Sequence, residues 1–146
     1  RAARRRVAVT QGSAFASTVL VLVAETKGVI VVREPTKPKP IYPKLPGGMG
    51  QDGETPKACA IRELDEKTGI LVRPDDLTCF RRHNDQNHTK YFFVVKLRAL
   101  PPMKRRGNEG EEPGVLSLQE ILREGNFLPA QMNIIRKDLE RFLTAL

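Results

Sequence analysis

Short apolar runs alternate with turns along the first part of the chain. Residues Phe15–Glu25 are rich in Val, Leu and Thr, and Val29–Arg33 is a second run rich in β-branched residues. The Lys27-Gly28 pair between them predicts a hairpin turn. Further strands are predicted at Ile70–Val72, Leu77–Arg82 and Tyr91–Leu100, with a turn at Pro74–Asp76 between the first two.

The middle of the chain changes from loop to helix. The segment Pro35–Pro46 holds five prolines, so it cannot be a regular helix or a central strand. It leads into the glycine-rich loop Met49–Gly53. Thr55 is a suitable N-cap, Pro56 suits the first helical position and Gly69 suits the C-cap, which predicts a helix from residue 56 to about residue 68.

The last third combines a loop with two helices. Pro101–Gly114 mixes Pro-Pro with basic and acidic residues and is expected to be a loop. Ser117 and Glu120 form a capping box for a short helix that ends at Gly125. A final helix is predicted by apolar residues at helical spacing, namely Ile135, Leu139, Phe142, Leu143 and Leu146. The order of elements predicts an α/β fold with a mixed sheet covered by helices.

Composition narrows the class of protein. A chain of 146 residues that is 40% hydrophobic and 29% charged fits one folded domain. Two cysteines are too few for a disulfide scaffold, and no apolar run reaches the roughly 18 residues of a membrane span. A disulfide-rich secreted protein and a membrane protein are therefore excluded, and no membrane partner is expected.

The net charge of +8 is concentrated at the start of the chain, where Arg1–Arg6 contains four arginines. Residues 1–6 are expected to form a basic arm and residues 7–146 the domain. A solvated tail is the first interpretation of the arm, with a nucleic-acid contact or a targeting remnant as alternatives. The expected location is intracellular, cytoplasmic or organellar, and the arginines allow a mitochondrial one. The positive charge favours anionic partners, such as phosphate compounds or RNA.

One stretch carries a recognisable motif. Residues Gly48–Ile70 read GMGQDGETPKACAIRELDEKTGI, with five residues between Gly48 and Glu54 and seven between Glu54 and Arg62. This stretch resembles the Nudix box, G-x5-E-x7-R-E-U-x-E-E-x-G-U, where U is a bulky aliphatic residue. Every defined position matches except the last glutamate, where Lys67 stands. The resemblance implies the Nudix α/β/α sandwich, a mixed β-sheet between helices.

The resemblance also implies an activity. Nudix hydrolases cleave the diphosphate linkage of a nucleoside diphosphate derivative with Mg²⁺ or Mn²⁺. Residues at i, i+3 and i+4 share one helix face, so Glu63, Glu66 and position 67 project together. Clustered carboxylates suit a hard cation that bridges to phosphate and lowers the pKa of a bound water.

Family roles carry over to matching positions only. The implied catalytic residues are Glu63, Glu66 and Arg62. The implied metal ligands are the Gly47 carbonyl, Glu63, Glu66 and one glutamate of a later loop, which we assign to Glu112, although Glu109 and Glu111 are placed equally well. The implied substrate contacts are Gly48, Glu54, Arg33 and Lys67.

Lys67 opens an alternative to the enzyme. Its ammonium would occupy the room of one cation, and Glu63 followed by Lys67 has the i,i+4 spacing of an ion pair. Either the chain is a Nudix pyrophosphohydrolase impaired by Lys67, or it is a catalytically degenerate Nudix module. Such a module would bind nucleotide or RNA, or form a structural part of a ribonucleoprotein.

Other chemically active side chains have simpler interpretations. Cys59 and Cys79 are expected to be buried, inert thiols. His83 and His88 flank a polar hairpin and are expected to be solvated. Aromatic residues are expected in the core rather than stacked on a base, namely Tyr42, Tyr91, Phe92 and Phe93. The basic run Lys104–Arg106 is expected to be a solvated loop.

Overall fold

The protein is described by a computed structural model that covers residues 14–123 and 125–145, so the basic arm lies outside the described residues. Its strands are β1 (Phe15–Val23), β2 (Gly28–Arg33), β3 (Gly47–Met49), β4 (Thr78–Asn84), β5 (Thr89–Leu97) and β6 (Glu112–Ser117). They form one six-stranded sheet in the order β4-β5-β1-β2-β6, with β3 paired to β1. β1 and β5 run parallel, and the other pairs are antiparallel, so the sheet is mixed.

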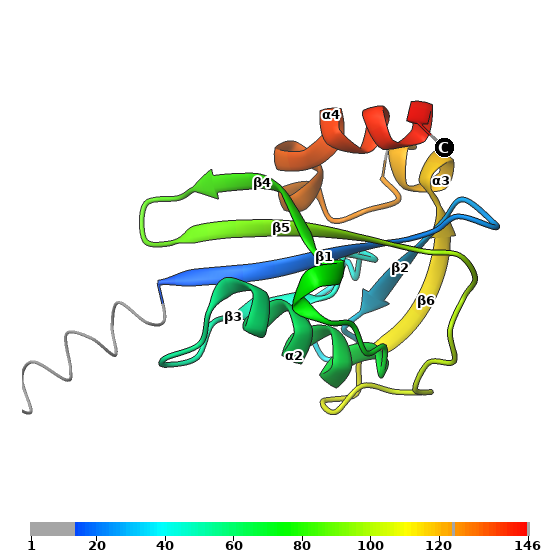
Figure 1. The fold of residues 1–146 in the computed structure, drawn as a ribbon. Helices are drawn as coiled ribbons and strands as arrows, with labels where there is room; N and C mark the ends of the chain where they lie inside the picture. Colours follow the sequence, from blue (N-terminus) through cyan, green and yellow to red (C-terminus); the bar gives the residue numbers. More distant parts are fainter. Residues whose placement is uncertain (1–13, 124, 146) are drawn as a thin grey trace, which may run out of the picture.

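Helices cover both faces of this sheet (Figure 1). α2 (Pro56–Thr68) lies on one face, while α3 (Leu118–Leu122) and α4 (Pro129–Ala145) lie on the other. A single 3₁₀ turn, η1 (Pro74–Asp76), precedes β4. The arrangement confirms the α/β/α sandwich expected from the sequence.

The central strand β1 supplies both layers of the core. Successive side chains of a strand point to opposite faces. Val19 and Val21 therefore pack with Leu64 of α2, whereas Leu20 packs with Leu139 of α4. All of these side chains are fully buried, so β1 lies at the centre of the core.

Locally encoded elements match their predictions. The hairpin between β1 and β2 is confirmed, with Lys27 in the left-handed conformation at φ 56°. α2 spans the predicted residues, begins after Thr55 and ends at Thr68, with Gly69 as its C-cap at φ 80°. The capping box of Ser117 and Glu120 is present, although α3 ends at Leu122 rather than at the predicted Gly125.

One strand prediction is wrong, and two strands were not predicted. Ile70–Val72 forms no strand. Its apolar residues Ile70 and Val72 instead pack into the core beside α2. β3 was not predicted because it is three residues long with two glycines. β6 begins inside the predicted loop Pro101–Gly114, and its Pro113 is tolerated because β6 is an edge strand.

Candidate functional site

The box helix is fixed at both ends by its caps. The Thr55 hydroxyl accepts a hydrogen bond from the Ala58 amide, 3.1 Å away, and the Gly69 amide donates to the Asp65 carbonyl at 2.8 Å. The left-handed conformation of Gly69 makes this turn possible. The caps therefore define both ends of the helix that carries the box side chains.

Arg62 connects the box helix to the loop before it. Its guanidinium donates to both oxygens of Glu54, to Glu63 Oε2 at 3.0 Å and to the Met49 carbonyl at 3.1 Å. It also lies 3.3 Å from Glu66 Oε1. The hydrogen bond from Arg62 lowers the pKa of Glu54, and the same contact raises the pKa of Arg62. Arg62 thus orients three carboxylates and remains charged.

Lys67 points into the site rather than away from it. Its Nζ donates a hydrogen bond to the Gly47 carbonyl at 2.5 Å and lies 3.6 Å from Glu63 Oε1. A third oxygen, Glu34 Oε2, lies 3.7 Å away. The side chain is only 10% exposed. An ammonium thus lies among oxygens that include two of the expected metal ligands, Gly47 and Glu63.

Glu34 and Lys44 complete this cluster and were not identified from the sequence. Lys44 Nζ lies 2.5 Å from Glu34 Oε1. Burial raises the pKa of Glu34, but the hydrogen bond from Lys44 and the charges of Lys44, Lys67 and Lys37 outweigh it, so the pKa lies below its ordinary value. Lys37 is near Glu34 in the sequence, but Lys44 and Lys67 are brought to this carboxylate only by the fold.

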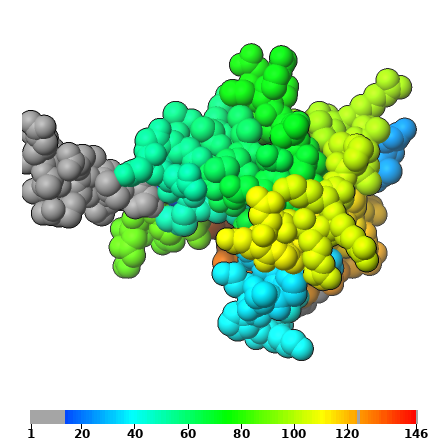
Figure 2. Space-filling model, turned by 90° about the horizontal axis from the view of Figure 1, so that it is seen from below, coloured from blue at the N-terminus to red at the C-terminus, as the bar shows by residue number. Residues whose placement is uncertain are grey.

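A cavity of about 630 Å³ opens above these groups. Its charged and polar lining includes Glu34, Lys37, Lys44, Gln51, Arg62, Glu63, Glu66, Lys67, Asn108, Glu109 and Glu111. Figure 2 looks onto this side of the molecule, where residues near 110 (yellow) lie beside the box helix (green) and the proline-rich segment (cyan). Segments distant in the sequence therefore converge on the box.

The loop glutamates separate into two groups. Glu109 and Glu111 line the cavity, and the buried Glu111 accepts a hydrogen bond from the Glu109 amide through its Oε1. Glu112, the residue assigned as a ligand from the sequence, does not line it; its side chain pairs with Arg106 at 2.9 Å. Glu111 precedes β6 and Glu112 begins it, and successive residues of an extended chain point to opposite sides.

Two residues expected to contact the substrate, Gly48 and Arg33, lie in different places. Gly48 lies against the box helix, and a Cβ there would come within 2.5 Å of the Glu63 carboxylate, so only glycine fits without displacing it. Arg33 instead lines a separate cavity of about 340 Å³ with Tyr42 and Asn126. The structure brings together Gly47, Gly48, Glu54, Arg62, Glu63, Glu66 and Lys67, but neither Arg33 nor Glu112.

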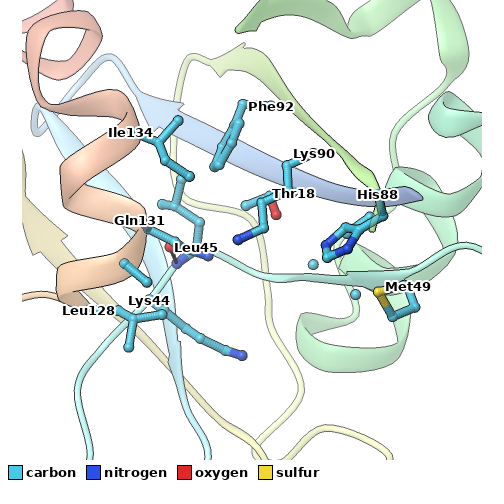
Figure 3. Close-up of a pocket in the computed structure, with 14 residues that line it drawn as sticks. Thr18, Lys44, Leu45, Met49, His88, Lys90, Phe92, Leu128, Gln131 and Ile134 are labelled. Atoms are coloured by element: carbon cyan, nitrogen blue, oxygen red, sulfur yellow. Dashed lines mark hydrogen bonds between the residues drawn. The ribbon is translucent and has the colours of Figure 1, made fainter. Parts of the chain in front are cut away.

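A second cavity of about 240 Å³ adjoins the first along β3 (Figure 3). Both are lined by Lys44 and Gly47–Met49. The remaining lining is mostly apolar, with Phe92 from β5 and Ile134 from α4. Gln131 of α4 accepts a hydrogen bond from the Leu45 amide at 2.9 Å. The two cavities therefore share a wall that is formed by Lys44 and β3.

The oxygen set does not fit a divalent cation. Mg²⁺ requires near-octahedral oxygen ligands at about 2.0–2.1 Å. Here the Lys67 ammonium already binds the Gly47 carbonyl and lies beside Glu63. Within residues 14–123 and 125–145, no three His, Cys, Asp or Glu side chains are grouped as a metal ion would need. The positive charge in the place of a ligand opposes a second cation.

The remaining candidates lie apart from this chemistry or are inert. Cys59 is buried, and burial raises the pKa of its thiol to about 11. The prediction that Cys79 is buried is wrong, because this cysteine is exposed on the edge strand β4. His88 lines the smaller cavity without the two further ligands that a metal site needs. In the part of the chain that is described, no helix is both long enough and apolar enough to span a membrane.

Comparison with known proteins agrees with this fold. The 8-oxo-dGTP diphosphatase of Escherichia coli K12 is 30% identical over 98 residues, which cover 64% of this chain and 71% of that protein. A MutT structure, from work on Aliivibrio salmonicida and Vibrio cholerae, has a TM-score of 0.69 at 19% identity and covers 86% of this chain and 94% of that one.

A third relative was solved with a nucleotide and a metal ion. It is a bifunctional NMN adenylyltransferase/ADP ribose pyrophosphatase from Francisella tularensis, complexed with AMP and manganese. Its TM-score is 0.70 at 19% identity, over 87% of this chain and 41% of that one, which supports the fold alone. The NUDIX domain family matches residues 14–137. Since this match covers most of the chain, the protein belongs to the Nudix family.

Proposed function

We propose that this chain is a nucleotide-binding Nudix domain in which Lys67 suppresses metal-dependent hydrolysis. The observation that carries the proposal is the position of Lys67 Nζ, hydrogen-bonded to the Gly47 carbonyl and 3.6 Å from Glu63 Oε1. A single positive charge satisfies the oxygens that a divalent cation would otherwise neutralise. A second cation there would meet Coulomb repulsion from a poorly screened ammonium.

Ligand binding does not require the same groups as hydrolysis. The large cavity offers three ammonium groups, Lys37, Lys44 and Lys67, which suit the oxygens of a phosphate chain. The adjoining cavity is mostly apolar, which suits a nucleobase. The relative in Escherichia coli is named for 8-oxo-dGTP, so a nucleoside triphosphate is a reasonable ligand class for this chain as well.

A working hydrolase is the second candidate function. It is favoured by Glu66, whose side chain is 40% exposed at the wall of the cavity, where Glu109 is also found. Cation binding by these carboxylates would require Lys67 to move away from the Gly47 carbonyl. The two candidates therefore differ in whether the parent protein binds a divalent ion.

The test measures metal, ligand and turnover on the same samples. Mn²⁺ is titrated by electron paramagnetic resonance into the parent, Lys67→Glu and Lys57→Glu; Lys57 is on the same helix but outside the charged cavity. Nucleotide binding is measured with EDTA, and hydrolysis with Mn²⁺ on nucleoside triphosphates, nucleotide sugars and dinucleoside polyphosphates. We expect the parent to bind nucleotide with EDTA, to bind Mn²⁺ weakly and to show negligible turnover.

The variants distinguish the possible outcomes. Lys67→Glu should bind Mn²⁺ at least about tenfold more tightly than Lys57→Glu, because it restores the carboxylate of the box. Turnover by the parent that disappears in Glu63→Gln would establish the hydrolase instead. A parent that binds no nucleotide with or without Mn²⁺ would contradict both candidates.

A further inference from the structure

Glu34 lies between two ammonium groups at the wall of the charged cavity. Its Oε1 is 2.5 Å from Lys44 Nζ, and its Oε2 is 3.7 Å from Lys67 Nζ. All three side chains are largely shielded, at 17%, 23% and 10% exposed. One carboxylate thus bridges two cations that come from separate parts of the chain.

Nearby positive groups differ in how fully they are neutralised. Arg62 is paired with three carboxylates, Glu54, Glu63 and Glu66. Among the described residues, Glu34 is the one acidic side chain within ion-pair distance of Lys44. Glu34 carries one negative charge against Lys44, Lys67 and the nearby Lys37, all of which lower its pKa. Lys67 is also 3.6 Å from Glu63 Oε1. Within the described part of the chain, Lys44 and Lys37 have only the carboxylate of Glu34 acting on both, so this end of the cluster retains a positive surplus that an added anion can neutralise.

The contacts of Glu34 are of a kind that a phosphate group can also make. Carboxylates and phosphates both present several acceptor oxygens to neighbouring ammonium donors. Glu34 follows β2 directly and its carbonyl accepts a hydrogen bond from Lys37, so its backbone belongs to a surface turn. Its side chain can therefore turn to solvent without unfolding a helix or a strand.

We infer that Lys44 and Lys67 form a metal-independent site for one phosphate group of the ligand, and that Glu34 occupies this site until the phosphate displaces it. This inference rests on the nucleotide-binding function proposed above and adds how the ligand is held. Glu34 then competes with the ligand for the two ammonium groups. Ligands whose phosphate is dianionic or more highly charged should therefore displace it more readily than monoanionic ones.

The two possible roles of Glu34 predict opposite effects. If Glu34 competes with phosphate, Glu34→Gln should bind inorganic pyrophosphate and ADP about three- to tenfold more tightly, since a nearby negative charge is removed. If Glu34 only holds the lysines in position, the same change should weaken binding. Lys44→Gln should weaken binding at least about tenfold in either case, because Lys44 would contact the phosphate.

The experiment is calorimetric titration in EDTA with pyrophosphate, ADP and adenosine. Glu25→Gln, an exposed residue between β1 and β2, is the charge-matched control for Glu34→Gln. Lys57→Gln is the control for Lys44→Gln. We expect tighter binding of pyrophosphate and ADP with unchanged adenosine binding for Glu34→Gln, weaker binding of pyrophosphate and ADP for Lys44→Gln, and parental affinity in both controls. Thermal melting of each variant verifies that it is folded.

Each other outcome overturns the inference. Binding by Glu34→Gln that is weaker than, or equal to, that of Glu25→Gln would show that Glu34 does not compete with phosphate. ADP binding that requires Mn²⁺ would show that the two ammonium groups do not suffice. In both cases nucleotide binding itself would stand, whereas absence of ADP binding with and without Mn²⁺ would contradict the proposed function as well.

Discussion

Arg62 and Glu54 are joined by two parallel hydrogen bonds, from Nε to Oε2 at 2.7 Å and from Nη2 to Oε1 at 3.1 Å. This bidentate geometry is specific to a planar guanidinium. Because Glu54 lies in the loop and Arg62 in α2, the pair holds the glycine-rich loop against the box helix. The box arginine therefore has an architectural role that is independent of any metal.

Arg62→Lys should destabilise the protein, because an ammonium cannot replace both hydrogen bonds or reach all the carboxylates that Arg62 contacts. We expect a loss of about 1–2 kcal/mol in the free energy of unfolding, measured by urea denaturation. The control is Arg136→Lys, an exposed i,i+4 partner of Glu140, which should change stability by less than about 0.5 kcal/mol. Equal effects in the two variants would contradict this role for Arg62.

Elements with local signals were predictable from the sequence, and elements that depend on distant partners were not. α2 is encoded by Thr55, Pro56 and Gly69, all within or next to the helix itself. β3 has no such signal, since its three residues become a strand only by pairing with β1. β6 likewise depends on β2, whose position beside it is set by the whole fold.

The same distinction holds for the site. The i, i+3 and i+4 spacing of Glu63, Glu66 and Lys67 made it predictable from the sequence that they lie on one helix face. Glu34 and Lys44 reach them because the proline-rich segment between them folds back, with Lys44 paired to Val32 across an isolated bridge. No periodic pattern in the sequence predicts this change of chain direction, so the approach of Glu34 and Lys44 to Lys67 could not be predicted.

Gly47→Ala should disturb the site through packing. A Cβ at Gly47 would lie 2.8 Å from Thr18 Cα and still closer to the Ser17 carbonyl oxygen, both of them backbone atoms that cannot rotate away. We expect a loss of about 1–3 kcal/mol in the free energy of unfolding and weaker nucleotide binding. Gly114→Ala in β6 is the control, because its Cβ would meet nothing nearer than 3.9 Å. Similar stability of the two variants would refute the predicted clash.

The two cysteines should differ in reactivity. Cys79 is exposed, whereas the thiol of Cys59 is buried with a pKa raised to about 11. At pH 8 the nucleophilic thiolate is therefore scarce at Cys59. A colorimetric thiol reagent should label one cysteine in the native protein and both in urea, and Cys79→Ser should leave the native protein unlabelled. Rapid native labelling of Cys79→Ser would mean that Cys59 is accessible.

Lys67→Glu should make the stability of the protein depend on a bound metal ion, because the ammonium of Lys67 is lost. Without metal, the new carboxylate would lie beside Glu63 and Glu34 and face the Gly47 carbonyl, with no proton to share. In EDTA we therefore expect the melting temperature to fall in the order parent, Lys67→Met, Lys67→Glu. The Lys67→Met variant removes the ammonium without adding a negative charge, so it isolates the repulsion.

Adding Mn²⁺ should then reverse the loss in Lys67→Glu alone. A ligand that binds only the folded state at 100 times its Kd stabilises by about 2.7 kcal/mol, which is about 5–10 °C for a chain of this size. Differential scanning calorimetry with and without Mn²⁺ measures the shift, with Lys57→Glu as the control for an added carboxylate on the same helix. A rise of the same size in the parent would mean that Lys67 leaves the site freely. Mn²⁺ would then compete with an ammonium rather than be excluded by one, and the hydrolase would become the better interpretation.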